Sequence, residues 1–274
     1  QTCRIRMTNA ADTFRLEERK ETDIPGPWMN YSACASYDRL NWFRVPTVFK
    51  DDHIEITCKP NRDVIYFASF APYPHDRHSN LITSALESPI ASLEILGKTP
   101  NGHDIELLTI GKSKEAGLSF WICARQHPSE TMAEWFAEGL LERLIDRDDF
   151  LARKLLTEAT FYVVPCMNPD GAWQGRTRRN GANVDLNREW VNPSMEASPE
   201  VFLVQQKMSK TGVDFFMDVH GDEELPYVFL GGPLEVPSVT ETMRQNFRNF
   251  QEALQATNPD YKRGYEYPGG APQN

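Results

Sequence analysis

Two segments of the sequence combine histidine and acidic side chains at spacings that suit a divalent metal ion. His127 and Glu130 are three residues apart and directly follow an apolar run that ends at Ala124. His220 follows a second apolar run, which begins at Val213. Two imidazoles and one carboxylate form a usual three-ligand shell of a catalytic zinc ion, whose fourth position is left to water. These three residues are therefore a candidate ligand set.

An arginine-rich loop lies between the two histidine segments. It contains Arg176, Arg178, Arg179 and Arg188. A guanidinium group matches a carboxylate with two parallel hydrogen bonds, so this loop is a candidate carboxylate-binding element. An ordinary solvated loop is the alternative interpretation. Each motif alone is common by chance. Their significance comes from their combination, since both histidine segments follow apolar runs and the arginine-rich loop lies between them.

The segments that would position these residues alternate between strand and helix from about residue 80. Residues 118–125 form a near-continuous apolar run, which is typical of a parallel strand covered on both faces. Apolar residues then recur at four-residue spacing and predict a helix, with Ser129 as its N-cap. These residues are Met132, Phe136, Leu140 and Leu144. Further elements are expected at 161–164 (strand), 200–208 (helix) and 213–219 (strand).

This alternation predicts an α/β domain whose mixed, mostly parallel sheet is flanked by helices. Ligands of such open sheets bind beyond the carboxyl ends of the strands, where both histidine segments lie. The N-terminal region instead mixes short β-rich runs with turn residues and predicts a small antiparallel β-sandwich. We therefore expect a sandwich domain over residues 1–79 and a catalytic domain over residues 80–274.

The composition excludes several classes of protein. The chain has 274 residues, of which 40% are hydrophobic and 25% are charged, as in ordinary globular proteins. No apolar run approaches the roughly 18 residues of a membrane span. The net charge of −10 argues against binding to nucleic acid or anionic lipid. The five cysteines are widely spaced and form no CxxC motif, which indicates reduced thiols in a cytoplasmic protein.

The order of four motifs resembles that of the zinc metallocarboxypeptidases. More narrowly, it is similar to the cytosolic carboxypeptidase subfamily, whose eukaryotic members remove glutamates from protein tails such as those of tubulin. The motifs are His127-Pro-Ser-Glu130, Asn168-Pro-Asp-Gly171, Asp185-Leu-Asn-Arg188 and Asp218-Val-His220-Gly. Upstream, three segments resemble the β-sandwich domain of the same subfamily: those that begin at Tyr31, Trp42 and Phe70.

The resemblance implies that His127, Glu130 and His220 bind one Zn²⁺ per chain. It implies that Arg178 polarises the scissile carbonyl and stabilises the oxyanion that forms from it. Zinc lowers the pKa of bound water to about 7 and so supplies a nucleophile at neutral pH. The activity implied is that of a zinc-dependent metallocarboxypeptidase.

Three more residues receive roles from the resemblance or from the chemistry around it. Asn187 and Arg188 match the pair that holds the terminal carboxylate of the substrate. Asp185 is a candidate to orient His127, because metal-bound imidazoles usually donate their other N–H to a carboxylate or carbonyl. A simple turn aspartate is the alternative for Asp185.

One departure from the family concerns the general base. The family places this glutamate on an apolar strand several dozen residues after the second zinc histidine, whereas the sequence ends at Asn274, 54 residues after His220. Glu266 lies in a turn-rich segment and is not assigned this role. We expect the C-terminal part of the catalytic domain, with the base, to lie beyond Asn274, so that this chain alone is not turnover-competent. A natural truncation that binds zinc without turnover is the alternative.

The expected substrates are peptides or protein tails with acidic C-terminal residues, glutamate above all, in the cytoplasm. Arg176 and Arg179 would add positive potential for such a tail. Two alternatives stay open for the function: a zinc-dependent acyl-amino-acid amidohydrolase, and a non-catalytic zinc-containing module that binds acidic tails. A purely structural domain without metal is a third and weaker one. The sequence leaves the oligomeric state open.

Overall fold

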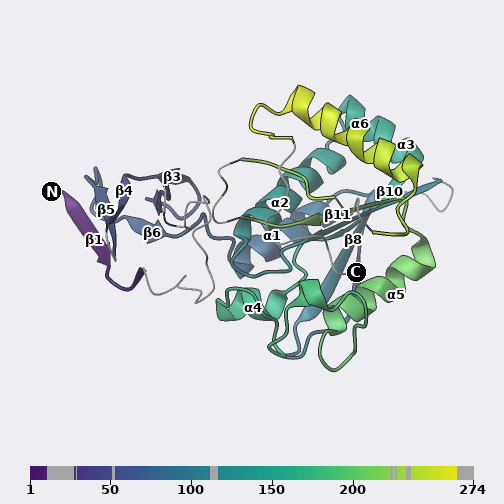
Figure 1. Cartoon of the computed structure of the whole chain (residues 1–274), viewed down its shortest axis with the longest axis horizontal. Helices are drawn as coiled ribbons and strands as arrows, with labels where there is room; N and C mark the ends of the chain where they lie inside the picture. The colour runs from purple at the N-terminus through teal and green to yellow at the C-terminus, as the bar shows by residue number, and fades with distance from the viewer. Residues whose placement is uncertain are drawn as a thin grey trace. The chain divides into compact units, whose positions relative to one another are not determined.

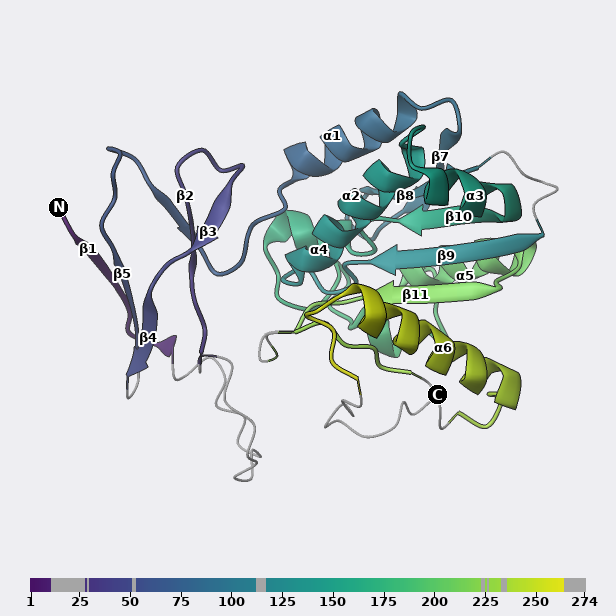
Figure 2. The ribbon, with the colours of Figure 1, turned by 90° about the horizontal axis from the view of Figure 1, so that it is seen from above.

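The computed structural model describes residues 1–10, 28, 30–50, 53–111, 117–222, 225, 227–232 and 236–263. The chain divides into two compact units, residues 1–221 and residues 222–274. The first unit contains all the predicted site residues, and its α-helices and strands are labelled across Figures 1 and 2.

Two small antiparallel sheets form the N-terminal part of the first unit. One has the order β1-β5-β4 and the other the order β3-β2-β6. Apolar side chains from both sheets form one cluster, which includes Ile54, Ile56 and Ala35. The predicted β-sandwich is therefore confirmed. Its strands are β1 (Cys3–Met7), β2 (Cys34–Ser36), β3 (Trp42–Arg44), β4 (Thr47–Lys50), β5 (His53–Cys58) and β6 (Tyr66–Ala68).

A five-stranded mixed sheet follows, with the order β11-β9-β10-β8-β7. β9 pairs in parallel with both β10 and β11, and the three arrows point the same way in Figure 2. β8 is antiparallel to both of its neighbours, so four of the five strands share one direction. This confirms the predicted mixed, mostly parallel sheet. The strands are β7 (Ala91–Lys98), β8 (Asp104–Ile110), β9 (Leu118–Ala124), β10 (Ala159–Val164) and β11 (Phe215–Val219).

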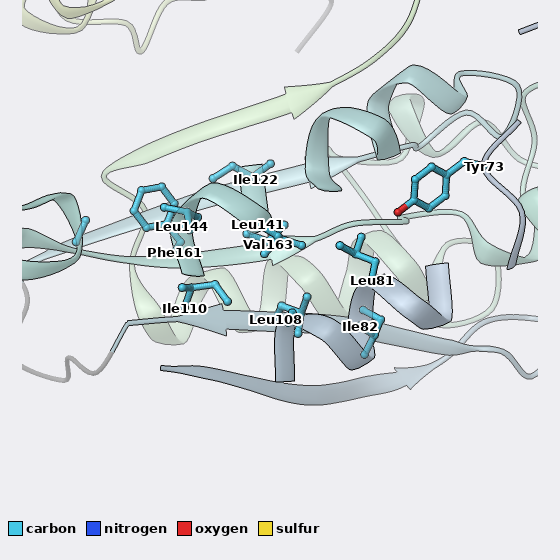
Figure 3. Packing of buried hydrophobic residues seen from close by; sticks show 12 residues of the cluster. Tyr73, Leu81, Ile82, Leu108, Ile110, Ile122, Leu141, Leu144, Phe161 and Val163 are labelled. Carbon is cyan, nitrogen blue, oxygen red and sulfur yellow. The ribbon is translucent and has the colours of Figure 1, made fainter. Parts of the chain in front are cut away.

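Helices cover both faces of this sheet, because successive residues of its strands alternate between two apolar clusters. Ile122 and Val163 belong to the cluster that also contains residues of α1 and α2 (Figure 3). Trp121 and Val164 belong to the other cluster, which contains residues of α5. This alternation explains the near-continuous apolar runs in the sequence. The helices of the first unit are α1 (His75–Leu86), α2 (Thr131–Ile145), α3 (Phe150–Glu158), α4 (Pro169–Gln174) and α5 (Pro199–Thr211), with the 3₁₀ turn η2 (Leu186–Arg188).

The second unit is built around one long helix, α6 (Glu241–Thr257). The Thr240 side chain caps this helix by accepting a hydrogen bond from the Met243 amide. An isolated parallel β-bridge pairs Val228, which precedes this helix in the sequence, with Tyr261, which follows it. No predicted site residue lies in this unit.

The three parallel strands end side by side, which brings distant loops together. The Ala124 carbonyl at the end of β9 accepts a hydrogen bond from the Met167 amide (2.8 Å) after β10. The Arg125 amide donates to the Val219 carbonyl (3.3 Å) at the end of β11. The two histidine segments therefore leave adjacent strands at the same edge of the sheet.

Candidate metal centre

His127, Glu130 and His220 meet at this edge. One ligand atom from each residue lies within 4.8 Å of the others, and this is the only such cluster of three among the described residues. Glu130 Oε1 is 2.7 Å from His127 Nδ1, and Glu130 Oε2 is 2.8 Å from His220 Nδ1. The two imidazole rings are 4.8 Å apart between centroids. Two imidazoles and a carboxylate, gathered in this way, are a donor set that fits zinc.

Both imidazoles present the same nitrogen to the centre of the cluster. Their Nδ1 atoms face Glu130, while their Nε2 atoms face carboxylates behind them: Asp185 Oδ1 at 3.1 Å from His127 and Asp218 Oδ2 at 2.7 Å from His220. Outer carboxylates of this kind fix the tautomer and orientation of metal-binding histidines. The arrangement is therefore that of two imidazoles held ready to offer Nδ1 to a cation.

Glu130 is positioned by the start of α2. It is the N-cap residue of the helix, and its side chain makes no capping hydrogen bond, so both carboxylate oxygens are directed to the cluster. The Gly221 amide also donates to Glu130 Oε2 (3.0 Å). The prediction that Ser129 is the N-cap is wrong, because the Ser129 hydroxyl donates instead to the Thr177 carbonyl (2.8 Å) across the site.

Two glycines allow the loops of the site to pack closely. A Cβ atom at Gly171 would overlap with Pro128, which lies between the first two candidate ligands. A Cβ atom at Gly221 would overlap with the Met132 side chain in the first turn of α2. Both glycines belong to the motifs on which the family resemblance rests. Their close approaches give a physical reason for glycine at these two positions.

The turn η2 carries two of the predicted residues to the cluster. Asp185 is its N-cap and accepts a hydrogen bond from the Asn187 amide (3.0 Å) while it contacts His127. Asn187 Nδ2 lies 3.4 Å from His220 Nε2. One short turn therefore places a carboxylate beside the first imidazole and an amide beside the second.

The predicted arginines lie farther out. Arg178 reaches the cluster through Asp185, with its Nε atom 2.7 Å from Asp185 Oδ2. The exposed Arg188 donates from Nη1 to the Asn187 carbonyl (2.9 Å). Within the described part of the chain, it forms no hydrogen bond or ion pair with the three candidate ligands. Arg176 and Arg179 donate to backbone carbonyls of their own loop, those of Asn180 and Asn183.

Burial has the largest single effect on the pKa of each group in the cluster. The hydrogen bonds and neighbouring charges together outweigh it, so the net shift of each pKa is opposite to the effect of burial. The two imidazoles lower the pKa of Glu130 to about 2, against the effect of burial. Asp218 and Glu130 raise the pKa of His220 to about 10, and Asp185 and Glu130 raise that of His127. Without a cation, the cluster therefore retains protons at neutral pH, and a metal ion must displace them.

Sequence reasoning gave no role to Asp218 and Gln126. Asp218 is two residues before His220, so both side chains lie on the same side at the end of β11, which is the one sequence signal that could have identified it. The fully buried Gln126 donates from Nε2 to Asp218 Oδ2 and accepts a hydrogen bond from Trp190 Nε1 (3.0 Å). These contacts fix the Asp218 carboxylate behind His220.

Replacement of Asp218 by asparagine is expected to raise the zinc dissociation constant of the chain by about 10- to 100-fold. The reason is that a neutral amide holds His220 less firmly than a carboxylate and lowers the basicity of its imidazole. Competition with a chromogenic chelator measures this constant. Asp214→Asn, immediately before the start of β11, is the matched control because Asp214 accepts its hydrogen bond from the Ser119 amide. Equal affinity in both variants would contradict the role of Asp218.

Comparisons with known proteins identify two regions of the chain. Residues 82–272 match the family model of zinc carboxypeptidases. Residues 2–70 match the model of the cytosolic carboxypeptidase N-terminal domain. In the part of the chain that the structure describes, no helix has the length and apolar character needed to cross a bilayer.

Individual proteins give the same picture. An uncharacterized protein of Zymomonas mobilis is 41% identical over 272 residues, which cover 99% of this chain and 68% of that protein. Cytosolic carboxypeptidase 6 of Mus musculus is 30% identical over 192 residues, which cover 64% of this chain and 35% of that protein. A solved metallo-carboxypeptidase from Pseudomonas aeruginosa, in complex with (2-guanidinoethylmercapto)succinic acid, has a TM-score of 0.89 and 40% identity. The match covers 99% of this chain and 70% of that structure, so each of these proteins is longer than this chain.

Proposed function

This chain belongs to the zinc carboxypeptidase family, and from that premise we propose that it forms the metal-binding and carboxylate-binding part of an enzyme that removes C-terminal residues from peptides or protein tails. The observation that carries the proposal is the meeting of His127, Glu130 and His220 at the carboxyl ends of parallel strands, with Asn187 beside them. Such strand ends are the usual position of an active site in an open α/β sheet.

In this proposal, His127, Glu130 and His220 hold one zinc ion per chain. Bound there, zinc would lower the pKa of a coordinated water to about 7 and polarise a carbonyl oxygen. Asp185 and Asp218 keep the two imidazoles turned with Nδ1 inward. The low pKa of Glu130 keeps its carboxylate charged at neutral pH, as a ligand requires.

Three residues of the arginine-rich loop act on the substrate. Arg178 donates to the developing oxyanion, and its position is supported by the ion pair with Asp185 beside His127. Asn187 and Arg188 hold the terminal carboxylate, since an amide and a guanidinium together provide several donors for two oxygens. The hydrogen bond from Arg188 to the Asn187 carbonyl holds the guanidinium beside the Asn187 backbone.

We propose that the enzyme prefers acidic C-terminal residues, glutamate above all. Four arginines lie between residues 176 and 188 of a chain with a net charge of −10. A local positive potential of this kind concentrates anionic substrates at the site. The resemblance of the four motifs to the cytosolic carboxypeptidase subfamily implies the same substrate class. This preference concerns the substrate residue and not the type of reaction, so the experiment below tests it separately from carboxypeptidase activity.

We further propose a division into an N-terminal β-sandwich domain, residues 1–79, and a catalytic domain that begins at residue 80. The two family models support this division, since one ends at residue 70 and the other begins at residue 82. We propose the cytoplasm as the location, because all five cysteines are free thiols and disulfides persist mainly in oxidising compartments.

The function is tested on the full reading frame that contains this chain. We expect release of free glutamate from a peptide that ends in several glutamates, at a higher rate than release from the same peptide ending in leucine. We expect no hydrolysis of N-acyl aspartate or N-acyl glutamate. Equal rates on the two peptides would reject the acidic preference alone, whereas hydrolysis of only the N-acyl amino acids would reject the carboxypeptidase in favour of an amidohydrolase.

A further inference from the structure

The segment of residues 71–78 lies between the two regions that match family models, which end at residue 70 and begin at residue 82. We propose that this connecting segment is a clamp on the first two turns of α2, and that it positions the loop that carries His127 and Glu130. The inference rests on the proposed zinc-binding role of that loop. It assigns a positioning role to residues that precede most of the catalytic domain.

The backbone of the connecting segment contacts the first turn of α2. The Ala71 carbonyl accepts hydrogen bonds from the Thr131 hydroxyl (2.9 Å) and from Trp135 Nε1 (3.1 Å). Thr131 directly follows Glu130, which is the N-cap of the helix. A displacement of Ala71 would therefore be transmitted through a single residue to the carboxylate of the site.

The side chains of the connecting segment hold the second turn of α2. The Tyr73 hydroxyl donates to Glu138 Oε2 (2.6 Å), and Arg77 Nε donates to the same oxygen (2.7 Å). The Arg77 guanidinium lies 3.8 Å from the Trp135 ring centroid, and the Tyr73 ring meets Trp135 edge-on. Charge-assisted and cation–π contacts of this kind are directional, so they fix the rotation of the helix as well as its distance.

Arg125 joins the connecting segment to the ligand loop itself. It donates from Nη1 to the Tyr73 carbonyl (2.9 Å) and from Nε to the Pro128 carbonyl (3.0 Å), between the two ligands. It also forms a buried ion pair with Glu134 of α2, which in turn contacts His78. Its φ angle of 54° lies in the left-handed region, which a non-glycine residue adopts when its surroundings enforce it.

The packing of α2 explains why its first half needs these contacts. The second half places the large side chains Leu141 and Leu144 in the apolar core. The fully buried apolar residues of the first half are the small Ala133 and Ala137, while Trp135 packs partly buried against the core and is itself held by the connecting segment. Small side chains interdigitate little and specify the position of a helix weakly. The polar contacts with the connecting segment therefore determine where the helix begins and where Glu130 lies.

The test is a double variant, Tyr73→Phe with Thr131→Val, which removes two hydroxyls and keeps the shape of both side chains. In the otherwise unchanged chain, we expect the zinc dissociation constant to rise about tenfold, as for other outer supports of a metal site. Thr83→Val is the matched control, because the Thr83 hydroxyl bonds only to the Ser79 carbonyl within α1 among the described residues. The control is expected to bind zinc as the wild type does.

A second measurement follows the helix directly. In the metal-free protein, amide hydrogen exchange over residues 130–138 is expected to be faster in the double variant than in the control. A lower melting temperature with an unchanged zinc dissociation constant would show a contribution to stability alone and would overturn the clamp, as would unchanged exchange. Failure of the wild type to bind zinc would overturn the proposed function and the clamp together. The two failures are therefore distinguishable, because the outcomes named before overturn the clamp alone.

Discussion

Replacement of His127 or His220 by alanine is expected to remove zinc from the chain. Each imidazole supplies one of three protein donors, and a site with two donors falls below the usual number of protein ligands for catalytic zinc. The change also leaves Asp185 or Asp218 behind the site without the imidazole that it orients. Metal analysis after dialysis should find one zinc per wild-type chain and close to none in either variant.

The matched control is His53→Ala, which removes a histidine from β5 of the N-terminal sandwich and leaves the cluster intact. This variant should retain one zinc per chain. Retention of zinc by His127→Ala or His220→Ala would reject the ligand assignment.

The same measurement has an expected pH dependence. The pKa of His220 is raised to about 10 in the metal-free cluster, so zinc must displace a proton from this imidazole, and the pKa of His127 is shifted in the same direction. Proton concentration rises as the pH falls, and zinc affinity should therefore weaken toward acid pH. Affinity that is constant between pH 6 and pH 8 would contradict this competition.

Replacement of Arg178 by alanine is expected to lower kcat/KM of the full reading frame by about 100- to 1000-fold, or about 2.7–4 kcal/mol, with most of the loss in kcat. This is the typical cost of one lost donor to a developing oxyanion. Arg178 is suited to this role because only its Nε atom is used for the ion pair with Asp185. Among the described residues, its two Nη atoms have no hydrogen-bond partner that would compete with a substrate.

Arg179→Ala is the matched control for this effect. Arg179 lies next to Arg178 on the same loop, is exposed, and donates to the Asn183 carbonyl (2.8 Å). Its loss removes the same charge from the loop, so it should change KM for acidic peptides and leave kcat close to the wild-type value. Zinc content measured in parallel should be unchanged in both variants. An equal fall of kcat in both would show that only the potential of the loop matters.

Much of the fold could be predicted from the sequence because it depends on local periodicity. Four-residue spacing identified the helix that the structure places at Thr131–Ile145, and apolar runs identified the strands that end before both histidine segments. The hairpin of β7 and β8 is absent from the predicted elements, although it completes the sheet. β7 and β8 follow one another without a helix between them, so the alternation of strand and helix gives no signal for this pair.

By itself, the sequence determined which residues are chemically suited to a metal centre and which strand ends would carry them. Only the tertiary structure decided what stands behind those residues. The Gln126 contact to Asp218 and the Arg125 contact to Tyr73 join segments that are far apart in the sequence, and both depend on side-chain directions. Spacing along the chain can place a ligand on a strand end, but orientation depends on which distant group fills the space behind it.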